Sequence, residues 1–226
     1  MRRPAGGFSL ISLMVGMTLS LLSVLAMLSL YRNMVGISVR SIQDSRQDGQ
    51  IAAALLTAQQ EMSNAGFWIS GTPDASFKLL ANAALSNGSL SGSARTLSGT
   101  ASTGNALVWS YKTANTATAS CAGLLVQDGK LSRLQGASGC TSTSQWNSTT
   151  WSASPLIEAN QPADFFTVVQ AACWPFNKAT SPISTLRIKV TLNAVTSSVD
   201  ASNSASTTTY VKSTSDVCLP NLVPGT

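Results

Sequence analysis

The chain has 226 residues, enough for one domain and an anchoring segment, and only 10% are charged, against roughly 25% in typical soluble domains. It has no histidine, the commonest general base and zinc ligand, and no G-x-S-x-G or D-x-D-x-D motif. The sequence therefore gives no support for an enzyme or for a metal or cofactor site. The net charge is +5, but the basic residues are scattered rather than clustered, so nucleic-acid binding is not supported either.

The first predicted element is an apolar helix. The 24 residues from Phe8 to Tyr31 carry no formal charge. As a helix rising about 1.5 Å per residue, they would span roughly 36 Å, more than the roughly 30 Å hydrocarbon core of a bilayer. Arg2 and Arg3 precede the run, which places the N-terminus in the cytoplasm and the rest of the chain outside. A secretory signal peptide has a shorter apolar core of about 7–15 residues and a cleavage site after it.

The helical pattern continues beyond the apolar run, with no proline between Asn33 and Ala65. Apolar residues recur there at helical spacing in two sets: Val35, Val39, Ile42, and then Ile51, Leu55, Ala58, Met62. Gly66 stands where a C-cap is expected. We therefore expect one helix from Phe8 to Ala65, apolar in its first half and amphipathic in its second.

Residues 67–226 are predicted to be mostly β. Strands are expected at 106–111, 165–170, 186–192 and 207–212, and a hairpin joins 121–126 to 131–134 through an Asp-Gly turn at 127–130. Stretches rich in Ser, Thr, Asn and Gly at 86–105, 141–154 and 196–209 are expected to be loops.

The cysteines Cys121, Cys140, Cys173 and Cys218 all follow the predicted anchor, so we expect them in an oxidising compartment. No C-x-x-C spacing indicates a zinc or redox motif. Three pairings are possible, and Cys121–Cys140 with Cys173–Cys218 is favoured because each bond closes a local loop.

The tryptophans have different expected environments. Trp109 and Trp174 are expected in the core. Trp146 and Trp151 lie in the polar stretch QWNSTTW and are candidates for either core packing or an exposed contact with another subunit, a carbohydrate or a surface.

Two stretches resemble a known family. Residues 6–15, GGFSLISLMV, are similar to the prepilin cleavage and methylation motif of type IV pilins and type II secretion pseudopilins. Residues 45–56, SRQDGQIAAALL, and 61–68, EMSNAGFW, resemble the helix end of PilW-like minor pilins. The resemblance implies an α+β, pilin-like fold with a leader at 1–7, a transmembrane and filament-core helix at 8–31, an amphipathic helix half at 32–66 and a β-rich domain with disulfides at 67–226.

The same resemblance implies a function in assembly rather than catalysis. A prepilin peptidase would cut between Gly7 and Phe8 and methylate the new amine of Phe8. The chain would begin in a bacterial inner membrane, with its β domain in the periplasm. It would then join other minor and major pilins, through an inner-membrane assembly platform, in starting a type IV pilus. Two alternatives remain open: a J- or K-type pseudopilin, or a plain membrane-anchored periplasmic binding or adhesion protein.

Ser12 departs from the family pattern, which has glutamate at this position. In the family, that carboxylate offsets the N-terminal ammonium of the neighbouring subunit, because an unpaired charge in an apolar core is heavily penalised. The Ser12 hydroxyl can instead bond to a carbonyl one turn earlier. Two interpretations stay open: a rarely incorporated subunit tolerates the loss, or the chain sits at the filament tip with no partner above it.

Overall fold

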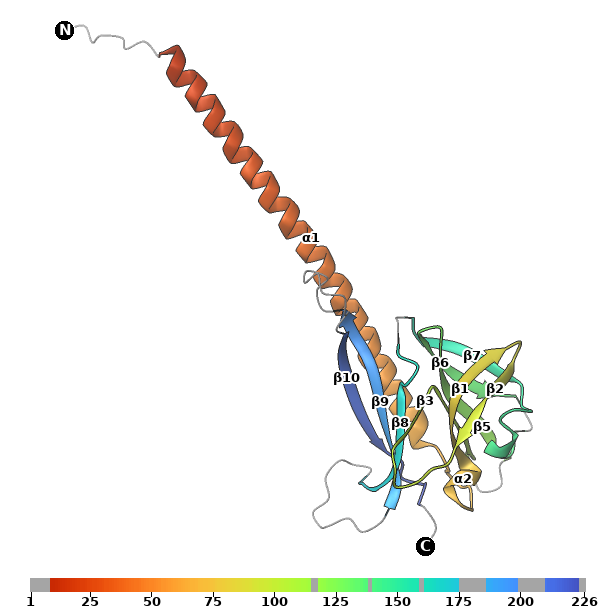
Figure 1. Cartoon of the computed structure of the whole chain (residues 1–226). Helices are drawn as coiled ribbons and strands as arrows, with labels where there is room; N and C mark the ends of the chain where they lie inside the picture. Colours follow the sequence, from red (N-terminus) through yellow and green to blue (C-terminus); the bar gives the residue numbers. More distant parts are fainter. Residues whose placement is uncertain are drawn as a thin grey trace, which may run out of the picture. The chain divides into compact units, whose positions relative to one another are not determined.

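The protein is described by a computed structural model that covers residues 9–114, 118–137, 140–158, 161–174, 186–198 and 210–223 (Figure 1). The chain divides into two compact units, Met1–Arg46 and Gln47–Thr226. This division falls inside the amphipathic half predicted at 32–66. One helix, α1 (Leu10–Ser63), contributes to both units and lies within the predicted bounds.

In the second unit, one face of α1 is buried. The buried residues follow each other at three- and four-residue spacing: Ile51, Ala54, Leu55, Ala58 and Met62. This face contains the whole second set of the predicted pattern, which is therefore confirmed. The spacing keeps the apolar side chains on one side of the helix, where they reach the core of the β domain.

The C-terminal end of α1 is capped by residues near the C-terminus of the chain. Gly66 adopts a φ of +73°, a left-handed conformation that glycine reaches without a steric penalty, so the predicted C-cap is confirmed. The side-chain amide of Asn221 donates hydrogen bonds to the carbonyl oxygens of Ser63 and Ala65, at 3.1 and 3.2 Å. Leu222 packs against Gly66 in the space that a Cβ would occupy.

The described strands form two antiparallel sheets, one of six strands in the order β2-β1-β4-β5-β6-β7 and one of four in the order β10-β9-β8-β3. The elements after α1 are α2 (Pro73–Ser76), β1 (Phe77–Ser86), β2 (Ser89–Arg95), β3 (Ser102–Gly104), β4 (Ala106–Tyr111), β5 (Ser120–Gln127), β6 (Lys130–Gly136), the 3-10 turn η1 (Thr143–Gln145), β7 (Trp151–Ile157), β8 (Phe166–Ala172), β9 (Leu186–Ser198) and β10 (Tyr210–Cys218). The α+β class expected from the sequence is confirmed.

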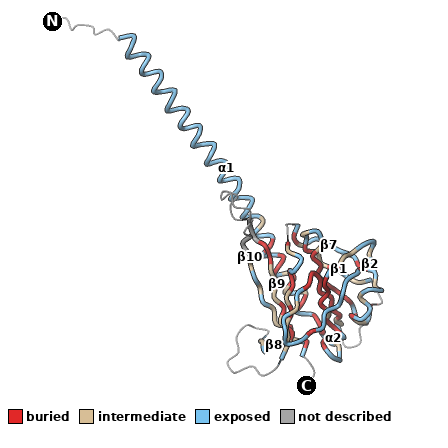
Figure 2. The backbone as a smooth tube through the Cα atoms, viewed as in Figure 1, coloured by how far each residue is buried: buried red, intermediate tan, exposed pale blue. Residues whose placement is uncertain are grey.

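The main core is shared by α1 and both sheets. Its cluster joins the buried face of α1 to Leu79 and Leu107 of the six-stranded sheet and to Val190 and Leu192 of the four-stranded sheet (Figure 2). Because side chains alternate along a strand, the neighbouring residues point to the opposite face of the six-stranded sheet. Leu80 and Val108 lie there in a second cluster, with Cys140 and Trp151.

The apolar strands are close to their predicted positions. β4 has the expected bounds, and β5 and β6 form the hairpin, in which Asp128 and Gly129 both have positive φ. β8, β9 and β10 overlap the strands predicted at 165–170, 186–192 and 207–212, of which 207–209 lie outside the described residues. In β9, the apolar residues Ile188, Val190 and Leu192 are 0% exposed, as the alternation predicts.

The expectation of loops at 86–105 and 141–154 is wrong. These stretches contain β2, β3, η1 and the beginning of β7. β2 is polar and mostly exposed, and it pairs with β1 through backbone hydrogen bonds that place little demand on side-chain type. In the third predicted loop, 196–209, β9 continues to Ser198 and residues 199–209 lie outside the described residues.

Two disulfides link the four cysteines, Cys121–Cys140 and Cys173–Cys218, which is the favoured pairing. They span 19 and 45 residues, and in the chain-entropy model loops of this size stabilise the folded state by roughly 3 and 4 kcal/mol. The second bond joins the end of β8 to the end of β10. It therefore fixes the start of the segment that carries Asn221 and Leu222.

A half-exposed ion pair links β9 to β10. Lys189 Nζ lies 2.8 Å from Asp216 Oδ2, and Thr191 Oγ1 donates a hydrogen bond of 2.5 Å to Asp216 Oδ1. The hydrogen bond from Lys189, and then that from Thr191, lowers the pKa of Asp216 from its ordinary value of 3.8. Both contacts favour the ionised carboxylate in the folded state.

We predict that Asn221→Ala lowers the free energy of unfolding by about 0.5–2 kcal/mol, because two carbonyls at the end of α1 lose their side-chain donor. Chemical denaturation of the full chain in detergent micelles measures this change. Asn147→Ala is the matched control, since Asn147 is an exposed asparagine of the loop before β7. Equal unfolding free energies for the two variants would contradict the capping role of Asn221.

We predict a pH-dependent stability difference between the wild type and Asp216→Asn. Since the folded-state pKa of Asp216 is lowered, its contribution is complete above 3.8 and disappears as the pH falls through the lowered value. Near neutral pH the difference should be below about 1 kcal/mol, because the pair is half-exposed. Urea denaturation at a series of pH values tests this, and in a Lys189→Met background the difference should shrink. Parallel stability curves would refute it.

Candidate functional site

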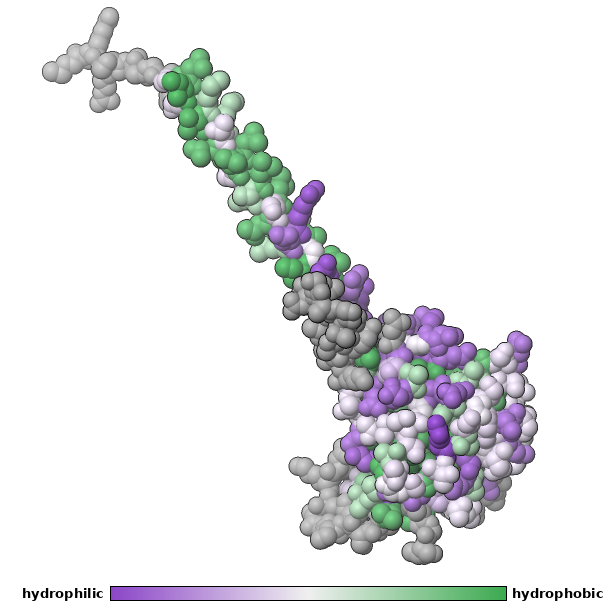
Figure 3. All heavy atoms as spheres, in the orientation of Figure 1, coloured by the Kyte–Doolittle hydropathy of each residue, from purple (hydrophilic) through white to green (hydrophobic). Residues whose placement is uncertain are grey.

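The first unit offers the largest exposed apolar surface among the described residues. Every residue from Ser9 to Arg46 is exposed, and the large apolar side chains between Leu10 and Ile42 are 43–78% exposed. The first charged residue of this helical stretch is Arg32. Figure 3 shows that apolar residues cover most of the visible face of the N-terminal part of the helix. Among the described helices, α1 alone has the length and composition of a membrane span.

Three hydroxyl groups of this apolar segment are hydrogen-bonded within the helix. The hydroxyls of Thr18, Ser20 and Ser23 each donate to the carbonyl three residues earlier, at 2.9 Å. Such bonds lower the cost of placing a hydroxyl among lipid tails or apolar side chains. Ser12 and Gly16 precede Ser20 and Ser23 at helical spacing, so small residues form one face that can approach another helix closely.

The residues of the predicted processing site lie at the edge of the described chain. Gly7 and Phe8 lie outside the described residues, and Ser12 is in the first turn of α1. The carbonyl of Ser9 accepts hydrogen bonds from the backbone N–H groups of Ser12 at 3.0 Å and Leu13 at 3.3 Å. The back-bond expected for the Ser12 hydroxyl stays a prediction, but Thr18, Ser20 and Ser23 use that geometry in the next turns.

The structure shows which tryptophans are buried and which are exposed. Trp109 is buried, as expected, whereas Trp174 is 40% exposed, so its expected core position is wrong. Trp151 is 3% exposed, and its Nε1 donates to the Trp146 carbonyl at 2.7 Å, which removes it as an exposed contact residue. Trp146 is half-buried against the same cluster. Trp68, at the end of α1, is the most exposed tryptophan described, at 53%.

The described side chains form no cluster typical of metal binding. Among residues that the structure describes, no three Cys, Asp or Glu side chains lie close enough to hold a metal ion, and all four cysteines are in disulfides. No family model, curated protein or solved structure matches the chain. The exposed apolar half of α1 is therefore the feature from which a function can be inferred, and what it can do is pack against lipid or other helices.

Proposed function

We propose that this chain is a PilW-like minor pilin that takes part in initiating and assembling a type IV pilus, at or near the filament tip. The observation that carries the proposal is the position of the apolar run. It begins directly after Gly6 and Gly7, preceded by Arg2 and Arg3, and it continues without a break into a helix half that packs against a disulfide-bonded β domain.

The proposed mechanism is assembly through α1. In the membrane, the exposed apolar side chains of α1 face lipid, and in the filament they face the helices of neighbouring subunits. Lipid tails are as apolar as leucine, so the transfer would be driven by close packing rather than by the hydrophobic effect. The face of small residues from Ser12 to Ser23 suits such packing, and the β domain would supply lateral contacts. The proposed partners are a prepilin peptidase, other minor and major pilins and the inner-membrane assembly platform.

We predict that the mature chain begins at N-methylated Phe8. Intact-mass measurement and N-terminal peptide mapping, in a host with and without its prepilin peptidase, would detect the loss of residues 1–7 and the added methyl group. Gly7→Val should block cleavage because it places a branched side chain next to the scissile bond, whereas Gly6→Ala should not. A chain that remains uncut in the peptidase-positive host would instead support a plain anchored periplasmic protein.

We also predict that Ser12 restricts the chain to the tip. In Ser12→Glu, the new carboxylate could pair with the ammonium of a subunit above it, so the variant should be incorporated along the filament. Immunogold labelling of sheared pili measures this distribution. Ser12→Gln, which has the same shape without the charge, should keep the wild-type pattern. Identical labelling of the wild type and Ser12→Glu would favour the interpretation that the loss of glutamate is merely tolerated.

A further inference from the structure

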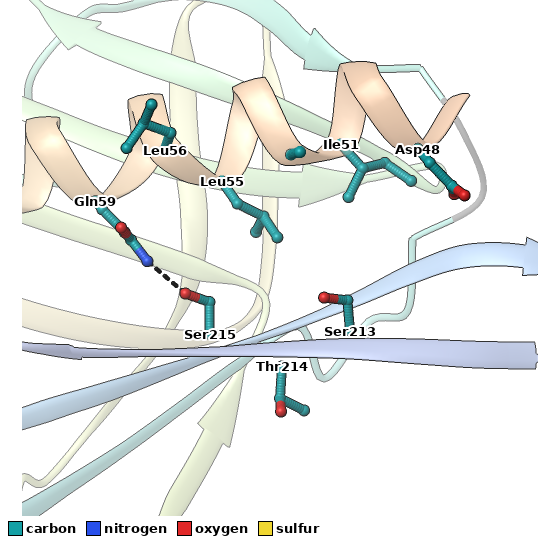
Figure 4. A pocket seen from close by; sticks show the side chains of 9 residues that line it. Asp48, Ile51, Leu55, Leu56, Gln59, Ser213, Thr214 and Ser215 are labelled. Carbon is teal, nitrogen blue, oxygen red and sulfur yellow. Dashed lines mark hydrogen bonds between the residues drawn. The ribbon is translucent and has the colours of Figure 1, made fainter. Parts of the chain in front are cut away.

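A groove of about 290 Å³ runs between α1 and β10 in the second unit (Figure 4). Its residues on α1 and β10 are Asp48, Ile51, Ala52, Leu55, Leu56, Gln59 and Ser213–Ser215. Figure 4 shows Ser213 and Ser215 directed toward the helix and Thr214 directed away from it. Ile51 and Leu55 give the groove an apolar wall, and a hydrogen bond from Gln59 to Ser215 crosses one end.

Among the described strands, β10 lies at one edge of the four-stranded sheet, beside this groove. An edge strand presents unpaired N–H and C=O groups to any extended chain, and proteins usually protect such edges with prolines, bulges or short strands. The other described edges have such features: β3 has three residues, β7 contains Pro155, and β2 contains Gly92 at a φ of 147°. β10 has nine residues without proline or glycine, and its one bulge, at Val211/Lys212, leaves Ser213–Cys218 in regular register.

The groove has an acidic end. Asp48 is exposed, and the described residues include no ion-pair partner for it. The ion pair of Lys189 and Asp216 belongs to the other face of the sheet, since Asp216 shares the side of Thr214 by alternation. A basic side chain entering the groove near Asp48 would therefore meet an unpaired carboxylate.

We propose that the edge of β10, which no other described strand pairs with, binds an extended segment of a partner protein, which adds a strand to the four-stranded sheet and fills the groove against α1. The neighbouring pairs in this sheet are antiparallel, so the added strand would run antiparallel to β10. Its alternate, helix-facing residues would be aliphatic and would contact Ala52 and Leu56. Along the groove, β10 runs from Ser213 on the Asp48 side to Ser215, which Gln59 contacts at the opposite end (Figure 4). The C-terminal end of an antiparallel strand would therefore lie near Asp48.

The test uses the full chain in detergent micelles and a fluorescent, end-capped peptide of alternating valine and threonine with a lysine at its C-terminal end. Fluorescence anisotropy should show saturable binding. Ala52→Asp should weaken binding at least about tenfold, because the new carboxylate would be buried beneath the added strand. Ala53→Asp is the matched control: Ala53 is also exposed on α1 but lies outside the groove, so this variant should bind as the wild type does.

Three further experiments test the direction and the position of the added strand. Moving the lysine to the N-terminal end of the peptide should weaken binding, and Asp48→Lys should reverse the preference between lysine- and glutamate-ended peptides. Amide hydrogen exchange should slow in residues 213–218 on peptide binding and stay unchanged in β7.

No saturable binding, or equal loss in Ala52→Asp and Ala53→Asp, would overturn the proposal. Self-association of the chain that Ala52→Asp abolishes would assign the edge to a second copy and also overturn it. None of these outcomes depends on processing at Gly7.

Discussion

Burial of one face of α1 is the interaction on which the β domain depends. The five buried side chains of α1, from Ile51 to Met62, lie in one cluster with residues of both sheets, so the helix forms one side of the core. Each large aliphatic side chain buried there contributes about 1.5–3 kcal/mol. Glu61, in the last turn, would be unfavourable beside the negative end of the helix dipole, but it pairs with Arg133 of β6 at 3.0 Å.

The same helix has to suit two environments, and its sequence changes accordingly. Before Arg32 the residues are mostly apolar and none is charged, and the hydroxyls of Thr18, Ser20 and Ser23 donate to carbonyls of the helix itself. Beyond Gln47 one apolar face is buried and the other residues are exposed or half-buried, which suits a helix that packs against a β domain on one side and meets water on the other.

Polar groups supply much of the domain's internal order because charged residues are few. Asn105, 9% exposed, is an example. Its side chain bonds the backbone N–H and C=O of Ala83 and the C=O of Val126, which joins β1 to β5 beside the bulge between Ala81 and Ala84. A buried amide that completes strand pairing in this way replaces backbone bonds that the bulge removes.

The sequence by itself determined the features that rest on local periodicity and conformational preference. These are the length and two-part character of α1, the glycine at its end, the Asp-Gly hairpin and the alternating strand at 186–192. The favoured cysteine pairing also followed from local spacing. Only the tertiary structure decided the polar edge strands, the burial of Trp151, the exposure of Trp174 and the groove beside β10. Backbone pairing leaves little trace in composition, and contacts such as Gln59–Ser215 and Ser63–Asn221 join residues more than 150 positions apart, where no local pattern can predict them.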